Sequence, residues 1–486
     1  MSEQSAAISP LGFSPPSQTK PVSQTKPATP PAAARTRLLL QGPVLATLLR
    51  LAAPNVLNLL ALAGMITFDG LFVGRLGADA LAGVSLAFPW VMMIMQATNG
   101  GMGGGVSSAV ARALGAGNRA RADALVHHAF VLALALGAVL STTLLLGGPF
   151  VFRWMGGEGE MLAAAISYGN VAFSGAVCLC TMNFLCNAVR GTGNMALPAS
   201  VIIGSVILHI AISPLLIFGW GPLPALGPAG AGWGLTAGFA AGGLVLIAHL
   251  RSRRSLVRLA FRGVKLQWSL FADILKVGVP GLINTAITNL SVVVLTGIAG
   301  HLGREAAIGY AMGARLEYIL IPIGGGFGMA IVAMVGTNWG AGQYRRAREI
   351  AWAGGATVAC ACALVGLLAA LLPGWWMGLY SHEEEIVRLG IGYLRILGPV
   401  YGLYGLGMAL FFAAQGMGQV VLAVTANALR LILSAAGALV ALYWLDLGID
   451  GMFFAVAFGF CAYAALNVVA ILKIEQPVLK AAQAGR

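Results

Sequence analysis

The feature that most constrains the fold of this chain is an apolar run, long enough to cross a bilayer, that recurs along its length. A transmembrane helix needs about 20 apolar residues. The chain of 486 residues is 58% hydrophobic and 9% charged, more apolar surface than a soluble protein of this length can bury. We place the spans near residues 48–73, 84–110, 122–147, 161–188, 196–219, 229–250, 272–299, 306–337, 348–373, 387–414, 420–445 and 450–472. The prediction is an all-α, multi-pass membrane protein with twelve transmembrane helices.

Charged residues lie between these runs, and their sign alternates from one connection to the next. The basic connections contain Arg112, Arg119, Arg121 and Arg190, and the segments RSRRSLVRLAFRGVK and QYRRARE. The alternate connections, such as GRLGADA and YSHEEEIV, are acidic or balanced. Because basic connections face the cytoplasm, we expect both termini inside the cell, in a bacterial inner membrane. The net charge of +13 then reflects topology, and the expected partner is the lipid bilayer, with no nucleic acid.

The two halves of the chain resemble each other. Pro54 and Pro280 are 226 residues apart, as are Asn58 and Asn284, and VGRLGADALAG aligns with AGHLGREAAIG at the same offset. With six spans per half, both halves enter the membrane in the same direction, which makes a parallel repeat. We therefore predict two pseudo-symmetric six-helix lobes with a cavity between them.

The repeat and the composition divide the chain into five segments. Residues 1–43 are rich in Pro, Ser, Thr and Gln, which predicts a disordered cytoplasmic tail. The expected order after it is a first lobe over 44–250, a basic cytoplasmic linker over 251–270, a second lobe over 271–472 and a cytoplasmic tail over 473–486.

The order of these features resembles the multidrug and toxic compound extrusion (MATE) family. Pro54 followed by FDGLFVGRLGADALAG is similar to its first helix and loop, and YAMGARLEYILIPIGGGFGMA to its eighth helix. VARALGAGNRARA and VGTNWGAGQYRRARE resemble the loops after its second and eighth helices. The resemblance covers roughly residues 45–472. It implies two lobes in a V and an antiporter that exports organic, often cationic or amphipathic compounds against inward flow of H⁺ or Na⁺.

Asp69 is a carboxylate inside the first predicted span. A charged side chain at membrane depth costs about 2.5–3.5 kcal/mol on insertion scales, which makes it a candidate functional residue. Asn58, Met65 and Asp69 follow helical spacing on one face, and Asp69 stands at the position of the family's coupling Asp. Asn58 and Met65 are candidate residues of the substrate cavity or gate. We interpret Asp69 as an ion site that binds either H⁺ or Na⁺. The alternative is an Asp near the interface, solvated or bonded to a neighbouring backbone.

The expected partners of Asp69 lie on other spans. His209 and Ser213 are one turn apart on the fifth span, at positions where the family often has Asn and Asp. A missing second carboxylate weakens the case for a Na⁺ cage of oxygen ligands, and His adds a second titratable group, so H⁺ is favoured. A neutral imidazole bonded to a backbone carbonyl is equally open for His209. Asn183 and Asn187 either complete the site or hold helices together.

The second half has no equivalent of Asp69, because Leu295 occupies the matching position. Asn284 and Thr288 form a polar stripe on the seventh span and are candidate cavity residues. The charged residues at membrane depth in this half are Arg315, Glu317, Arg395 and Arg430. We interpret Glu317 as the partner of Arg430 or Arg395 in a structural ion pair. A role of these charges in substrate binding or gating is the alternative.

Several function classes are excluded or disfavoured by the sequence. It has no ATP-binding motif and no paired catalytic groups within the spans, so we expect an ion gradient in place of a cofactor, and no enzyme. The glycine runs at 100–105 and 324–328 are either hinges or packing surfaces. The main alternative function is a flippase for lipid-linked intermediates of the same broad superfamily, which would have a more cationic cavity. We expect a monomer.

Overall fold

The computed structural model describes residues 31–220, 224–260 and 265–484, and the regular structure of these ranges is helical. Ten stretches of it are long and apolar enough to cross a membrane, and α6 and α7, bent by 44° at their junction, make an eleventh. The first predicted span is α2, a helix of 31 residues. These elements correspond in order to the twelve predicted spans, and the all-α fold is confirmed.

The first lobe is built from the elements before the long basic connection. They are α2 (Val44–Gly74), α3 (Ala78–Gln96), the π-helical turn η1 (Ala97–Met102), α4 (Gly103–Gly115), α5 (Arg119–Trp154), α6 (Gly159–Ser174), α7 (Ala176–Arg190), α8 (Ala196–Phe218) and α9 (Pro228–Arg251). The second span is thus α3, η1 and α4 in sequence, and the π-helical turn widens it where Thr98 and Asn99 lie.

The second lobe repeats this order. Its elements are α10 (Trp268–His301), α11 (Arg304–Ala314), α12 (Glu317–Gly340), α13 (Tyr344–Leu371), α14 (Pro373–Gly378), α15 (Glu384–Leu397), η2 (Gly398–Val400), α16 (Tyr401–Met417), α17 (Val421–Tyr443) and α18 (Gly448–Ala484). The repeat is visible in the element bounds, since α8 and α17 both have 23 residues and begin at Ala196 and Val421. Pro54 and Pro280 lie inside the corresponding helices α2 and α10.

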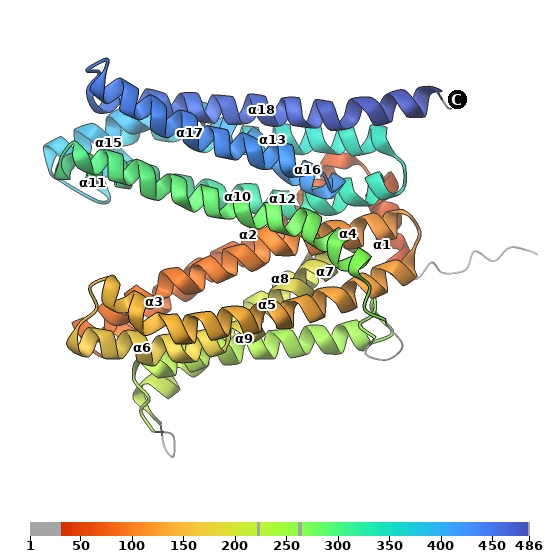
Figure 1. Cartoon of the computed structure of the whole chain (residues 1–486), viewed down its shortest axis with the longest axis horizontal. Coiled ribbons are helices and arrows are strands. Elements are labelled where there is room, and N and C mark those ends of the chain that lie inside the picture. Colours follow the sequence, from red (N-terminus) through yellow and green to blue (C-terminus); the bar gives the residue numbers. More distant parts are fainter. Residues whose placement is uncertain (1–30, 221–223, 261–264, 485–486) are drawn as a thin grey trace, which may run out of the picture.

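The two lobes form a V (Figure 1). Their helices converge at the end that holds α1 (Pro31–Gln41), α4 and the C-terminus, and diverge toward the end that holds α3, α6, α11 and α15. The basic connections, including those around Arg119 and Arg345, lie at the convergent end, while the acidic or balanced connections lie at the divergent end.

The helices α2 and α10 pass from one lobe to the other. Leu48 near the start of α2 packs in the core of the second lobe, whereas Val73 near its end packs in the core of the first. The helix α10 does the reverse, because Ile274 packs in the first core and Ile298 in the second. Each lobe therefore holds one end of the other lobe's leading helix.

The glycine run at 100–105 packs the lobes against each other. A Cβ atom on Gly101 would lie 2.9 Å from the backbone of Leu282, and one on Gly105 would lie 2.5 Å from the Ile274 carbonyl oxygen. Of the two readings left open by the sequence, the structure favours a close-packing surface for this run, since only glycine admits these backbone contacts.

The expected disorder of residues 1–43 is wrong for part of that segment. Residues Pro31–Gln41 form the helix α1, and Leu39 is 2% exposed within the second lobe's core. The Asn338 Nδ2 donates to the Leu39 carbonyl oxygen at 3.0 Å. The leucines at the end of this segment supply apolar contacts that an average over its proline-rich composition does not predict. The rest of the predicted tail, residues 1–30, lies outside the described residues.

Candidate ion-coupling site and central cavity

Asp69 of α2 and His209 of α8 form a buried pair in the first lobe. The His209 Nε2 lies 2.7 Å from the Asp69 Oδ1, and the two residues are 2% and 8% exposed. The His209 Nδ1 lies 3.2 Å from the Ser213 hydroxyl oxygen, one turn further along α8. The three side chains form a chain of hydrogen bonds from α2 into the interior of the lobe. Within the described residues, the His209 ring bonds to a carboxylate and a hydroxyl group, and to no backbone carbonyl.

The local sequence of α8 and α9 makes room for this chain. His209 and Ser213 share one face of α8, since they are four residues apart. That face meets Gly234 of α9, where a Cβ atom would lie 2.2 Å from the Ser213 Oγ and 3.2 Å from the His209 Nδ1. A side chain at residue 234 would occupy the space of the polar chain, so the site depends on a glycine of a third helix.

Asn183 and Asn187 of α7 bond to η1 and not to Asp69. The Asn183 Nδ2 donates to the Thr98 hydroxyl oxygen at 2.7 Å. The Asn187 Nδ2 lies 3.2 Å from both the side-chain and backbone carbonyl oxygens of Asn99. The sequence left two interpretations open, completion of the ion site or contact between helices. These hydrogen bonds agree with a role in holding helices together.

A central cavity lies between the lobes and measures about 1130 Å³, including the space at its open mouth. The predicted residues Asn58, Asn284 and Thr288 line it. Lining residues that sequence reasoning did not single out as cavity residues include Asn55, Gln96, Asn99, Arg190, Phe411 and Asn427. The pseudo-equivalent Asn58 and Asn284 thus face the same space from α2 and α10, as their common offset indicates.

Arg190, which the sequence places in a basic connection, is also a cavity residue. It ends α7, is 1% exposed, and its Nη1 donates to the Asn99 Oδ1 at 2.7 Å. Its Nε has no hydrogen-bond partner among the described residues. A signal was present in the repeat, where RGTGN aligns with QGMGQ. Gln415 there is also fully buried, and its Nε2 donates to the Gly100 carbonyl oxygen at 3.3 Å, so the two aligned residues meet the same turn, η1.

Two smaller cavities flank the central one. The first-lobe cavity, about 640 Å³, is lined by the predicted Met65 and Asn183 together with Met92, Met95 and Phe239. Met65 lies one turn before Asp69 on α2, which brings this cavity close to the coupling pair. The second-lobe cavity, about 500 Å³, is lined by Glu317, Arg430, Thr288 and Tyr404, of which Thr288 and Tyr404 also line the central cavity.

The predicted ion pair between Glu317 and Arg430 or Arg395 is absent from the described residues. Glu317 instead accepts a hydrogen bond from the Tyr393 hydroxyl group. Arg430 donates to the Asn427 Oδ1 at 2.9 Å and to the Ser291 Oγ at 3.1 Å. The predicted ion pair was wrong because the Glu317 carboxylate and the Arg430 guanidinium each form hydrogen bonds to neutral side chains instead.

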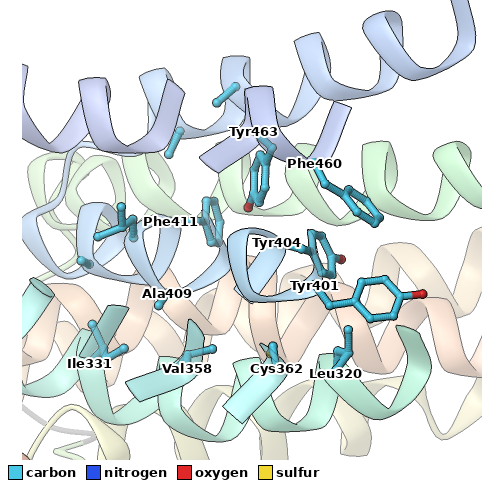
Figure 2. Close-up of a cluster of buried hydrophobic side chains, with 14 of the residues drawn as sticks. Leu320, Ile331, Val358, Cys362, Tyr401, Tyr404, Ala409, Phe411, Phe460 and Tyr463 are labelled. Carbon is cyan, nitrogen blue, oxygen red and sulfur yellow. The ribbon is translucent and has the colours of Figure 1, made fainter. Parts of the chain in front are cut away.

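The Arg430 guanidinium lies among aromatic rings. Its central carbon is 5.6–5.9 Å from the ring centres of Tyr404, Phe460 and Tyr463. Figure 2 shows Tyr404 and Phe411 on α16 next to Tyr463 and Phe460 on α18. Such cation–π contacts stabilise a desolvated cation by about 2 kcal/mol.

The predicted residues Arg315 and Arg395 lie apart from these sites. Both are exposed, and Arg315 lies 5.1 Å from the ring centre of Tyr380. Neither lines the three cavities described above. The structure therefore does not bring them together with the other predicted cavity residues.

Comparison with known proteins places this architecture among transporters. The sequence model of the MatE family matches residues 54–215 and 280–440, which are corresponding parts of the two lobes. A "FAD transporter" of Shewanella oneidensis is 29% identical over 386 residues, covering 77% of this chain and 82% of that protein. "Multidrug export protein MepA" of Staphylococcus aureus is 22% identical, covering 89% and 95% of the two chains.

Solved structures show the same fold. A MOP superfamily transporter from Pyrococcus furiosus, described as having a binding pocket of reverse polarity, superposes with a TM-score of 0.79 at 25% identity, over 91% of this chain and 97% of that one. A MATE structure in a bent conformation gives a TM-score of 0.83 at 23% identity, over 92% and 98% of the chains. With both lobes matched by the family's sequence model, this chain belongs to the MatE family of multidrug efflux transporters.

Proposed function

We propose that this protein exports small amphipathic organic compounds in exchange for H⁺, with Asp69 and His209 as the coupling pair. The family consists of transporters, which are driven by ion gradients and are not enzymes. The observation that carries the proposal is the 2.7 Å contact between the buried Asp69 carboxylate and the His209 imidazole. Two titratable groups that share a hydrogen bond can exchange a proton with little movement. A pairing with His in place of a second carboxylate supports H⁺ over Na⁺.

The path from this pair to the lobe interface runs along α2. Asp69 lies near the end of α2 that packs in the first lobe, and the start of α2 packs in the second. Between them, Pro54 interrupts the helical hydrogen bonds, and the Asn55 Nδ2 donates to the Gly326 carbonyl oxygen of α12 at 3.2 Å. Protonation of Asp69 removes a charge that attaches α2 to α8. A change in that attachment would move the lobes relative to each other.

The orientation follows from the charges of the connections. We propose that the convergent, basic end faces the cytoplasm of a bacterial cell and that the protein acts as a monomer in the inner membrane. The present structure is then the outward-facing state, in which the central cavity is reached from outside. The named relatives transport drugs or FAD, and both are organic molecules, the class of substrate that we propose for the central cavity.

A flippase for lipid-linked intermediates is the second candidate function. The observation in its favour is the guanidinium of Arg190 in the central cavity, because lipid-linked intermediates carry phosphates and a guanidinium binds phosphate well.

Replacement of Asp69 tests the coupling site. We expect Asp69→Asn to abolish the exchange of dyes for protons in everted vesicles at a normal protein level, because an amide cannot take up the proton. Asp79→Asn, at an exposed residue in the first turn of α3, is the matched control and should exchange normally. Unchanged exchange by Asp69→Asn would remove Asp69 from the mechanism.

Ion replacement tests the choice of H⁺. Transport by the wild-type protein should persist when Na⁺ is replaced by choline and should stop when a protonophore is added. Transport that requires Na⁺ and survives the protonophore would identify Na⁺ as the coupling ion.

A further inference from the structure

We infer that the central cavity binds substrates that join an anionic group to a planar aromatic body, with Arg190 as the partner of the anion. This inference rests on the proposed transport function and names its substrate class. It departs from the cationic compounds that the family resemblance implies.

The first observation is the state of Arg190. The residue is 1% exposed, lines the central cavity, and forms no ion pair with any carboxylate in the described part of the chain. Its neutral partner is Asn99, and its Nε lacks a hydrogen-bond partner among the same residues. An unpaired buried charge is costly, and an anion that reaches it recovers that cost. Arg190 therefore favours the entry of an anionic group.

The second observation is the polarity of the rest of the cavity. Over residues 31–220, 224–260 and 265–484, none of the lining side chains is a carboxylate, and the polar ones besides Arg190 are amides or hydroxyl groups such as Asn58, Asn284 and Thr288. A cationic substrate would meet no opposite charge and would be repelled by Arg190. The repulsion is stronger at low dielectric than in water.

The third observation is the aromatic wall that the second lobe contributes to the same cavity. Tyr404, Phe411, Phe412 and Tyr463 line the cavity there, and Figure 2 shows three of these rings on the facing helices α16 and α18. Arg430 lies behind this wall, 5.8 Å and 5.9 Å from the ring centres of Tyr404 and Tyr463. Flat aromatic bodies pack well on such rings.

According to these observations, the anionic group of a substrate binds to the first lobe and its aromatic body binds to the second. Arg190 belongs to α7 in the first lobe, and the aromatic wall belongs to α16 and α18 in the second. A substrate that contacts both is held best when the lobes are at one separation. A change in the angle between the lobes moves the anion partner away from the aromatic wall and weakens binding, which is what release requires.

A matched pair of dyes tests the charge preference directly. Fluorescein is an anion and tetramethylrhodamine methyl ester a cation, and both contain the same xanthene ring system. Binding of each dye to the full-length protein in nanodiscs is measured by fluorescence polarisation, and transport is measured in proteoliposomes. We expect fluorescein to bind at least about tenfold more tightly, the difference made by one charge-assisted hydrogen bond. Equal binding, or tighter binding of the cation, overturns the inference.

Two variants change the cavity charge in different ways. Arg190→Gln should weaken fluorescein binding about tenfold or more, and Arg190→Lys should retain part of it. Asn284→Asp leaves Arg190 in place and keeps the acceptor of the 2.9 Å hydrogen bond from the Asn427 Nδ2. It adds a negative charge, so it should weaken fluorescein binding and strengthen binding of the cation. Arg153→Gln, at an exposed arginine outside the cavity, is the control. Unaltered dye preference in both Arg190→Gln and Asn284→Asp contradicts the inference.

Two further experiments are needed. One distinguishes a lipid headgroup from a free anionic compound, and the other distinguishes failure of the substrate class from failure of the coupling site. Proteoliposomes with fluorescent phosphatidylglycerol report movement of a lipid headgroup by dithionite quenching. If Arg190 governs that movement and not fluorescein transport, the anion is a lipid headgroup. If the wild type transports only the cation, in exchange for H⁺, this inference fails and the proposed function stands. If Asp69→Asn still exchanges fluorescein for H⁺, the coupling site fails and the substrate class stands.

Discussion

At the scale of single residues, several buried polar groups are bonded in short chains that cross between helices. Asp69, His209 and Ser213 bond in series from α2 to α8, and Asn427 bonds to Asn284 and Thr288 from α17 to α10. A buried polar group without a partner costs about 1–3 kcal/mol. The bond between Asp69 and His209 holds α2 against α8, so a change in the protonation of either side chain alters the packing of these two helices.

Replacement of His209 tests this dependence. His209→Leu leaves the Asp69 carboxylate without its donor, so we expect a loss of about 1–3 kcal/mol in stability, seen as a lower midpoint of thermal unfolding of the purified protein. His209→Gln keeps an amide donor and should lose less. His382→Gln, at an exposed histidine, should leave the midpoint unchanged. Equal midpoints for His209→Leu and wild type would mean that the pair does not stabilise the α2–α8 contact.

At the scale of helices, glycine decides where the lobes meet. The run at 100–105 lies against the backbone of α10 and against Gln415. These contacts lie next to η1, so the turn that presents Asn99 to the cavity is also the surface that the second lobe packs on. A larger side chain at this surface would therefore change both the distance between the lobes and the shape of the cavity.

Gly105→Ala tests the contact between α4 and α10. Its Cβ atom would lie 2.5 Å from the Ile274 carbonyl oxygen and 2.7 Å from the Gly278 nitrogen. Overpacking of this kind costs about 1–3 kcal/mol, so we expect a less stable convergent end and slower transport. Gly297→Ala in α10, where a Cβ atom meets nothing within 4 Å, is the matched control and should be neutral or slightly stabilising. A stable, fully active Gly105→Ala would show that the convergent end tolerates a wider spacing.

At the scale of the whole molecule, charges hold the convergent end of the V together. Asp273 of α10 accepts hydrogen bonds from the Arg112 Nη2 at 2.8 Å and from the Arg121 Nη2 at 2.9 Å. Arg112 also donates to the Ser108 hydroxyl group, which in turn donates to the Gln415 carbonyl oxygen of the second lobe. The ion pairs attach the start of α10 to α4 and α5, and the network reaches the second lobe through Ser108 and Gln415.

Asp273→Asn tests the network. A partly exposed ion pair contributes about 1 kcal/mol, so its loss should raise the ratio of molecules open at this end roughly fivefold. The distance between spin labels at the exposed positions Ala120 and Gln343, in a background without native cysteines, measures the change. Glu385→Gln removes an exposed pair within one helix and is the control. High salt should act in the same direction as Asp273→Asn, and an unchanged distance distribution would contradict the role.

The sequence predicts some elements of this fold correctly and misses others. The pair α8 and α17, with the same length and offset, follows from the repeat in the sequence, and so does the convergence of Asn58 and Asn284 on one cavity. The helix α1 was missed because composition averages its leucines with the proline-rich residues before them. Arg190 was missed because a basic residue next to a turn has the same pattern whether it faces water or a cavity.

The sequence by itself determined the number of spans and the repeat, because the bilayer imposes one length on every segment in turn, and its charges predict the orientation of the spans. It also pointed to Asp69, since a carboxylate in an apolar run is visible without neighbours. Only the tertiary structure decided that Asp69 meets His209, that Glu317 bonds to Tyr393 and that Arg190 faces the central cavity. Each of these depends on how a helix is rotated about its axis, and that rotation is set by packing against segments far away in the chain.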